Sequence, residues 1–127
     1  MTLDKKYTAL GKPVTLFEQL DRVPTRCKFI EYHSDQLTSA CPVTGQPDFY
    51  EVTISIAADG TAIETKTLKL YLETYRDQQI FCEDLAVKIC EDLFAASEPK
   101  KCTVSLQQRR RGGIQITATH EISKDNA

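Results

Sequence analysis

The sequence predicts an α+β fold, an antiparallel four-stranded sheet with two helices on one face, in the order strand, strand, helix, helix, strand, strand. Two observations lead to this prediction. Apolar and polar residues alternate along residues 49–57, 102–107 and 114–119, which is typical of half-buried strands. Between the first and second of these segments, apolar residues recur every three or four positions, which predicts amphipathic helices.

Size, composition and charge restrict the classes of function. The 127 residues match one domain, since domains usually hold about 100–150 residues. Hydrophobic residues make up 41% and charged residues 27%, which excludes a wholly disordered chain. No apolar run approaches the ~18 residues of a membrane span, and no secretion signal is evident, so we expect a cytoplasmic protein without a membrane partner. A pI near 5.7 argues against nucleic acid as a partner.

The chain divides into an N-terminal arm at residues 1–25, a single domain at residues 26–122 and a polar tail at residues 123–127. Mixed charge and two prolines predict little regular structure in the arm. The domain begins with a loosely alternating strand at residues 26–32. Prolines and a glycine then predict a loop across residues 34–48.

A strand at residues 49–57 is followed by the turn signal Asp59-Gly60 and then by two helices. The first helix is expected at residues 65–76 and the second at residues 80–96, where Pro99 closes it. The apolar stripes consist of Leu68, Tyr71, Leu72 and Tyr75 in the first helix and of Cys82, Leu85, Ala86, Ile89, Cys90 and Leu93 in the second.

Two strands end the domain, at residues 102–107 and 114–119, and Arg111-Gly112-Gly113 predicts the hairpin turn between them. The outward face of the resulting sheet is polar and needs no cover. A sheet of four short strands still has two open edges, which can pair with further strands. We therefore expect the subunits to associate into a closed, ring-like homo-oligomer.

The cysteines predict free thiols. They lie at positions 27, 41, 82, 90 and 102. Their number is odd and no pair has the C-x-x-C spacing, a pattern that favours free thiols in a reducing compartment. Zinc takes cysteine and histidine ligands, but neither His33 nor His120 has paired-ligand spacing, so we expect no metal.

The loop around Cys41 is the first candidate for chemistry. It holds a thiol among turn residues, seven positions before Asp48. A thiolate on a fixed loop is a strong nucleophile, and a nearby carboxyl group can donate a proton. The residues alone leave a second interpretation open, because most free cysteines are small buried hydrophobes and an aspartate often begins a strand.

Three cations are candidates for binding phosphate. Lys66 and Lys69 lie three residues apart near the start of a predicted helix, where free backbone N–H groups attract anions. Arg111 lies at a hairpin tip, and a guanidinium group binds phosphate in a bidentate manner. A solvated lysine face and a solvated turn remain the alternatives.

Four segments together resemble one family. They are Leu37-Thr-Ser-Ala-Cys41-Pro-Val-Thr-Gly-Gln-Pro-Asp48-Phe49, Glu64-Thr-Lys-Thr-Leu-Lys-Leu-Tyr71, Phe81-Cys-Glu-Asp84 and Arg111-Gly-Gly-Ile114. In this order and spacing the chain resembles the NADPH-dependent 7-cyano-7-deazaguanine reductases, the QueF family of queuosine biosynthesis, in their short single-domain form. That family has the tunnelling fold (T-fold), which agrees with the predicted element order.

The resemblance implies reduction of the nitrile of 7-cyano-7-deazaguanine (preQ0) to the amine of 7-aminomethyl-7-deazaguanine (preQ1). Cys41 would form a covalent thioimide at the nitrile carbon, Asp48 would donate a proton to the nitrogen, and two NADPH molecules would supply hydrides. The resemblance also implies a decamer of two stacked pentamers with active sites between neighbouring subunits. The remaining implied roles are substrate contacts by Ile63, Glu64, Thr65, Cys82 and Glu83, and contacts to NADPH phosphates by Lys66, Lys69 and Arg111.

One departure from the family concerns Cys82, because the family usually has histidine there. Cysteine lacks the basicity and the reach of an imidazole, which leaves weakened or altered chemistry open. QueF-like amidinotransferases use the same thioimide but add ammonia to preQ0 in tRNA, making archaeosine. They generally lack the lysine motif that Lys66 and Lys69 form here. A third hypothesis is a non-catalytic T-fold protein that binds a purine- or pterin-like ligand, against which Cys41 and Asp48 argue.

Overall fold

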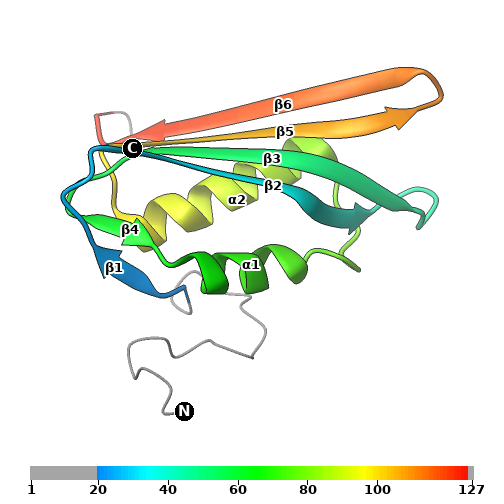
Figure 1. The fold of residues 1–127 in the computed structure, drawn as a ribbon. Coiled ribbons are helices and arrows are strands. Elements are labelled where there is room, and N and C mark those ends of the chain that lie inside the picture. Colours follow the sequence, from blue (N-terminus) through cyan, green and yellow to red (C-terminus); the bar gives the residue numbers. More distant parts are fainter. Residues whose placement is uncertain (1–19, 126–127) are drawn as a thin grey trace, which may run out of the picture.

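The computed structural model describes residues 20–125, and Figure 1 shows one sheet with two helices packed against one of its faces. Within these residues the elements are β1 (Arg22–Pro24), β2 (Phe29–Ala40), β3 (Pro47–Ala57), β4 (Thr61–Ile63), α1 (Thr65–Glu73), α2 (Cys82–Ser97), β5 (Lys101–Arg111) and β6 (Ile114–Ser123). The predicted α+β class and the ββααββ order of the main elements are confirmed. Most of the predicted arm and the end of the predicted tail lie outside the described residues.

The main sheet has the strand order β2-β3-β5-β6, and every neighbouring pair is antiparallel. Apolar side chains alternate along the central strands as the sequence predicts, so each strand turns one face to the helices. The buried side chains of β3 and β5 on this face are Tyr50, Val52, Ile54, Ile56, Cys102, Val104 and Leu106. From the other side α2 contributes Leu85, Ile89 and Leu93, none of which is exposed. The resulting single core makes the sheet a rigid support for its loops.

Two parts of the sequence-based assignment are wrong. The loop predicted for residues 34–48 is much shorter, because β2 continues to Ala40 and β3 begins at Pro47. The pairing of β2 with β3 changes register between Ser34 and Leu37. After this shift the side chains of Leu37 and Ser39 are buried in the core. In addition, the end of the predicted arm forms β1, which pairs with β4 in a small second sheet.

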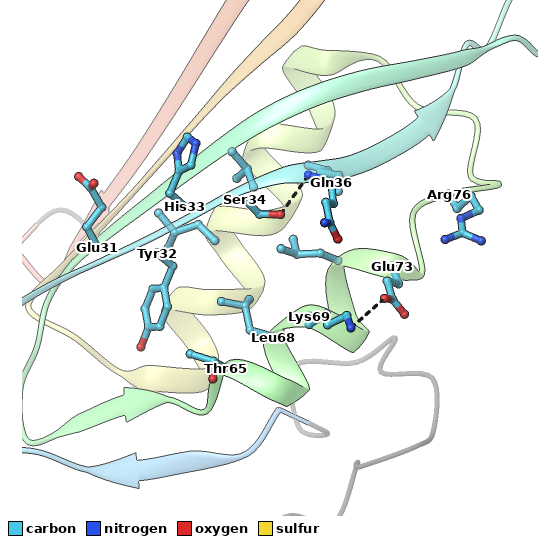
Figure 2. A pocket seen from close by; sticks show the side chains of 14 residues that line it. Glu31, Tyr32, His33, Ser34, Gln36, Thr65, Leu68, Lys69, Glu73 and Arg76 are labelled. Atoms are coloured by element: carbon cyan, nitrogen blue, oxygen red, sulfur yellow. Dashed lines mark hydrogen bonds and ion pairs between the residues drawn. The ribbon is translucent and has the colours of Figure 1, made fainter.

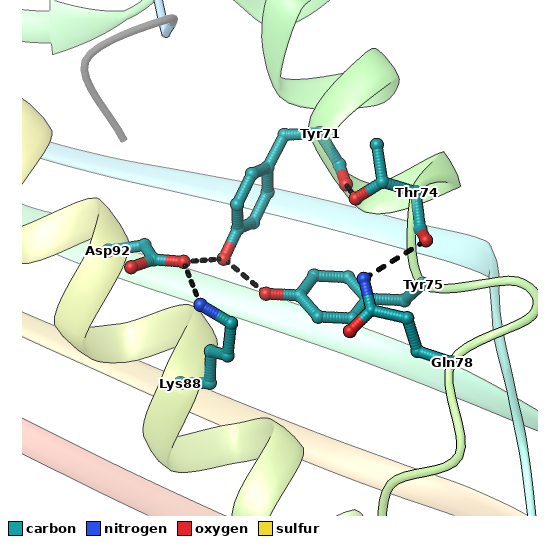
Figure 3. Close-up of polar contacts among 6 residues, drawn as sticks. All are labelled: Tyr71, Thr74, Tyr75, Gln78, Lys88 and Asp92. Atoms are coloured by element: carbon teal, nitrogen blue, oxygen red, sulfur yellow. Dashed lines mark hydrogen bonds and ion pairs between the residues drawn. The ribbon is translucent and has the colours of Figure 1, made fainter. Parts of the chain in front are cut away.

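Hydrogen bonds among a buried cluster of hydroxyl groups link α1 to α2, as Figure 3 shows. Tyr71 donates a hydrogen bond of 2.6 Å to Oδ2 of Asp92 on α2, and the hydroxyl groups of Tyr71 and Tyr75 lie 2.7 Å apart. Lys88 also pairs with Asp92, at 3.1 Å. Burial raises the pKa of both tyrosines, so both hydroxyl groups stay protonated at neutral pH. The cluster holds the helix that carries the predicted cofactor lysines in a fixed orientation.

The two ends of the layered structure differ (Figure 1). The loop end comprises the β2–β3 loop, the segment between α1 and α2, and the tip of the β5–β6 hairpin. The opposite end, here the β4 end, comprises β1, β4 and the start of α1. The predicted site residues are distributed over both ends.

Candidate active site

Cys41 lies at the loop end, in the loop that joins β2 to β3. Its backbone N–H donates to the Gln46 carbonyl at 2.8 Å, and its carbonyl accepts from the Gly45 N–H at 2.8 Å. Gly45 has a φ of 74°, a left-handed conformation that glycine adopts without strain. These bonds close the loop and hold the partly exposed thiol in a fixed position.

The same loop makes the thiol acidic. Hydrogen bonds from the Thr44 side chain, and then from the backbone N–H groups of Thr44 and Val43, lower the pKa of Cys41 from its ordinary 9.0 to about 7. These donors stabilise the thiolate, and the charge of Asp48 opposes them more weakly. Since the thiolate is the nucleophilic form, the predicted nucleophile has the activation that attack on an electrophilic carbon needs.

Asp48, the predicted proton donor, lies beside this loop and is almost fully buried. Arg111, 63 positions later in the sequence, donates to Oδ1 of Asp48 and also donates to Oε1 of Gln46 at 2.6 Å. Hydrogen bonding to Asp48 raises the pKa of Arg111, to which a contact with the Cys41 sulfur adds. The structure therefore joins the predicted nucleophile, proton donor and one cofactor cation in a single cluster.

The segment before α2 packs against the same loop. The Ala40 N–H donates to the Gln78 carbonyl at 2.8 Å, and the Ile80 N–H donates to the Ala40 carbonyl at 3.1 Å. These bonds place the start of α2 at the loop end. Glu83 is exposed in the first turn of α2, where the helix dipole favours a negative charge. Glu83 therefore lies at the loop end, as Cys41 does, with its side chain exposed to solvent.

Cys82, which stands where the family usually has histidine, is only 2% exposed. Burial, assisted by the charges of Glu83 and Asp48, raises the pKa of its thiol to about 11. The thiol is therefore protonated at neutral pH and does not replace an imidazole as a proton carrier. In this chain Cys82 lies on the core side of the cluster of Cys41, Asp48 and Arg111, away from solvent.

The other predicted substrate residues lie at the β4 end. Ile63 is buried at the end of β4, and Thr65 is the first residue of α1. Glu64 is the N-cap of that helix, and its carboxylate accepts hydrogen bonds from the backbone N–H of Lys66 at 2.9 Å and of Thr67 at 2.8 Å. The nine residues of α1, about 13 Å of helix, run between this end and the loop end. One chain therefore does not bring these residues to Cys41.

A cleft of about 500 Å³ opens between β2 and α1 (Figure 2). Thr65 and Lys69, two of the predicted ligand residues, line it together with Arg76. Lys69 forms only an exposed ion pair with Glu73, at 4.0 Å, so its ammonium group is accessible at the rim. The remaining lining residues are Glu31, Tyr32, His33, Ser34, Gln36, Leu37, Val52, Ile54, Leu68, Leu72 and Glu73. The lining thus combines apolar side chains with two cations and the two carboxylates of Glu31 and Glu73, a mixture of apolar surface and a few polar groups that is typical of a ligand site.

Large apolar side chains are exposed around the loop end. They are Val43, Phe49, Phe81 and Ile114, with exposed fractions of 80%, 45%, 49% and 75%. The guanidinium of Arg109 lies over the Phe49 ring at 5.7 Å. Apolar side chains gathered around a reactive thiol are typical of a surface that another molecule covers.

Sequence reasoning missed three residues of this region. Thr44 lies three positions after Cys41 in a turn that contains a glycine. This short spacing is a local signal that its hydroxyl group can reach the thiol. Arg76 lies seven positions after Lys69, a spacing that places both on one side of a helical segment and was also available. The side chain of Gln46 accepts a hydrogen bond from Arg111, which is distant in sequence, so no local signal indicated this contact.

Other kinds of site find no support in the part of the chain that the structure describes. Within residues 20–125, no three side chains of the metal-binding types lie close enough together to hold an ion. In the same range, no helix is long and apolar enough to cross a membrane. All five cysteines fall in this range and are free thiols.

Comparison with known proteins gives concordant matches. A family model described as QueF-like protein matches residues 47–127. The NADPH-dependent 7-cyano-7-deazaguanine reductase of Syntrophus aciditrophicus is 38% identical over 94% of this chain and 88% of its own length. The enzyme of that name from Frankia casuarinae is 46% identical over 93% of this chain and 97% of its own length. The solved apo structure of the archaeosine synthase QueF-Like is 23% identical, with a TM-score of 0.72 over 76% of this chain and 95% of that chain, and this likeness supports the predicted T-fold alone.

Proposed function

The chain belongs to the QueF-like family, in which its curated relatives are NADPH-dependent 7-cyano-7-deazaguanine reductases, and we propose that it reduces the nitrile of preQ0 to the aminomethyl group of preQ1. One observation carries the proposal. The Cys41 thiol sits in a closed loop with its pKa lowered to about 7, beside the buried Asp48. A thiolate adds reversibly to a nitrile carbon, which is the covalent step that this reduction requires.

Cys41 and Asp48 perform the addition. The sulfur bonds to the nitrile carbon, one carbon–nitrogen π bond breaks, and the proton of the thiol reaches the nitrogen through Asp48, so no electrons are gained or lost. Two NADPH molecules, bound one after the other, would each supply one hydride to complete the four-electron reduction. The carbon–sulfur bond must break before the amine forms, and a thiol of low pKa leaves readily.

Lys66 and Lys69 are the proposed ligands of the cofactor phosphates, and we propose Arg76 as a third because it lines the same cleft as Lys69. Lys66 is exposed on α1, while Lys69 and Arg76 line the cleft. We expect Lys66→Ala combined with Lys69→Ala to weaken NADPH binding far more than formation of the preQ0 adduct. A matched control removes two exposed lysines elsewhere, Lys28→Ala with Lys100→Ala, and leaves NADPH affinity unchanged. Loss of the adduct with unchanged NADPH affinity contradicts the assignment.

A homo-oligomer completes the proposed site, and the resemblance points to a decamer of two pentamers. Among the described residues, the outer edges of β2 and β6 have no partner strand. Cys41 and Glu83 lie at the loop end, whereas Ile63, Glu64 and Thr65 lie at the β4 end. A neighbouring subunit that presents its β4 end to the loop end brings both groups of proposed substrate contacts together.

Mixing inactive variants tests this arrangement. Subunits with Cys41→Ala mixed with subunits carrying Lys66→Ala and Lys69→Ala should regain part of the reductase activity, because Cys41 lies at the loop end whereas α1, which carries both lysines, begins at the β4 end. Cys41→Ala mixed with Glu83→Ala should regain none, because both residues lie at the loop end. A fully active monomer in light scattering disproves the shared site.

The reaction itself is tested by intact mass. Incubation with preQ0 in the absence of NADPH should add the mass of preQ0 to the chain, and Cys41→Ala should abolish the adduct. Adding NADPH should then release preQ1 and consume two NADPH for each nitrile. An adduct on another cysteine refutes the assignment of Cys41. Formation of an amidine with ammonia, without NADPH oxidation, selects the amidinotransferase reaction in its place.

We infer a cytoplasmic location for this chemistry. The reactive thiol is partly exposed, and all five cysteines are free. A reducing compartment keeps such a thiol available, whereas an oxidising one converts exposed thiols to disulfides. Labelling of the protein in fractionated cells tests this inference.

A further inference from the structure

Arg111 binds the carboxylate that the proposed reaction uses to move a proton. Its guanidinium donates to Oδ1 of Asp48 and to Oε1 of Gln46, the second at 2.6 Å. The Asp48 side chain is 6% exposed and that of Arg111 is 36% exposed, so water reaches the pair from the arginine side. While this pair holds, Oδ1 of Asp48 faces a guanidinium N–H and not a substrate nitrogen.

The position of Arg111 allows its side chain to move without disturbing the sheet. It is the last residue of β5, directly before Gly112 and Gly113, whose φ values are 59° and 81°. Strand pairing changes register between Gln108 and Arg111, and the space around both glycines is open. A long side chain at such a hairpin tip can exchange one anion for another while the strands stay in place.

We propose that Arg111 is a positioning residue that couples cofactor binding to proton transfer. In the free enzyme it holds Asp48 and Gln46, and when NADPH binds, its guanidinium moves to a phosphate group of the cofactor. Phosphate competes well for this guanidinium, because it can accept both hydrogen bonds that Asp48 and Gln46 now share and offers more negative charge than one carboxylate. The proposal rests on the proposed function, which supplies both the nitrile and the phosphate.

Release of Asp48 gives the thiol proton a route to the substrate. The Cys41 proton passes to the freed carboxylate, the sulfur bonds to the nitrile carbon, one carbon–nitrogen π bond breaks, and Asp48 returns the proton to the nitrogen. The step balances without an oxidant or a reductant. Addition to the nitrile then proceeds without the cofactor but is faster when the cofactor is already bound.

Two reagents that react with the Cys41 sulfur distinguish the restraint of Asp48 by Arg111 from a general change in the reactivity of the thiolate. Iodoacetamide alkylates the Cys41 thiolate and needs no proton donor, whereas addition of preQ0 needs a proton on the nitrile nitrogen. The ratio of the two rates, measured by peptide mass at Cys41 with and without NADP⁺, reports the availability of Asp48. NADP⁺ is used because it carries the phosphates of the cofactor but no hydride.

In the wild-type protein, NADP⁺ should raise the ratio of preQ0 addition to alkylation about tenfold, below the ~100-fold or more of a fully effective general acid. Arg111→Ala should show the raised ratio without NADP⁺, and NADP⁺ should add nothing. Arg111→Gln should behave in the same way, because it also lacks the charge. Arg110→Ala, an exposed neighbour on the same strand, is the matched control and should behave as the wild type does.

Opposite outcomes overturn the proposal. If Arg111→Ala keeps the response to NADP⁺, or lowers the ratio, then Arg111 does not restrain Asp48. An effect confined to one of the two Arg111 variants contradicts it as well. Failure of the proposed function looks different, because the wild-type protein then forms no preQ0 adduct under any condition, while iodoacetamide still labels Cys41.

Discussion

Replacement of Thr44 by valine tests how the loop activates its thiol. Valine keeps the shape of threonine but removes the hydroxyl group, whose hydrogen bond to Cys41 is the largest of the contributions that lower the pKa of this thiol. The same hydroxyl oxygen accepts from the Gln46 N–H at 3.2 Å, so Thr44→Ser, which keeps it, serves as the control for the shape of the loop.

The magnitude follows from the ionised fraction. With a pKa of about 7, Cys41 is about half thiolate at pH 7, whereas at the ordinary value of 9.0 only about 1% is thiolate. Loss of the largest of three hydrogen bonds should lower the thiolate fraction at pH 7 roughly fivefold. The remaining thiolate is more basic and reacts about threefold faster, since nucleophilicity rises with pKa. The net loss of rate at pH 7 is then about twofold. The two rates become equal at roughly pH 7.5, and at higher pH the variant reacts faster because its thiolate is the stronger nucleophile.

The assay is the rate of Cys41 alkylation by iodoacetamide between pH 5 and 10, followed by peptide mass. Because the thiolate reacts, the rate rises with pH and levels off above the pKa of the thiol. The profile of Thr44→Val should rise at higher pH than that of the wild type and cross it, whereas Thr44→Ser should superimpose on the wild type. Superimposed profiles for Thr44→Val and the wild type refute the assignment of the hydroxyl group as the main activating donor.

Three further predictions concern burial and backbone geometry. Iodoacetamide at pH 8 should label Cys41 and leave Cys82 unlabelled, because the Cys82 thiol is buried with a pKa of about 11; labelling of both contradicts its packing in the core. Tyr71→Phe should destabilise the fold by about 1.5–3 kcal/mol in urea unfolding and Tyr75→Phe by only about 0.5–1.5 kcal/mol, since Tyr71 alone donates to a carboxylate; equal losses argue against that bond. Gly45→Ala should cost about 1–2 kcal/mol through its φ of 74° and slow alkylation of Cys41, and an unchanged urea midpoint would show that the loop does not need this conformation.

Periodicity predicted the helices and the central strands, because burial of one face imposes a regular spacing on the apolar residues. It failed at residues 34–40, where β2 continues through a polar stretch. Ser39 there is fully buried, and its hydroxyl group lies 2.7 Å from that of Tyr50, so a polar residue occupies a core position. The strands β1 and β4 have three residues each, too few for any periodic signal.

The sequence by itself determined the fold class, the family and the candidate nucleophile, because all three depend on residues that are close in the chain. Cys41 and the groups that lower its pKa lie within one tight loop, so a motif of a few residues encodes them. The apolar stripe of the second helix also predicted that Cys82 faces the core, and the burial of Cys82 confirms this. Only the tertiary structure decided that Glu64 lies at the far end of α1 from Cys41.

The contact between Asp48 and Arg111 was also decided by tertiary structure, for an identifiable physical reason. The antiparallel register of β3 and β5 pairs Tyr50 with Gln108, near the ends of the two strands that carry Asp48 and Arg111. A register shift in β5 between Gln108 and Arg111 then precedes the guanidinium that donates to Asp48. A slip of one residue turns every side chain of a strand to the other face, so the pair exists only in the register that buries both apolar faces. The register is a property of the whole core, and no local pattern in the chain contains it.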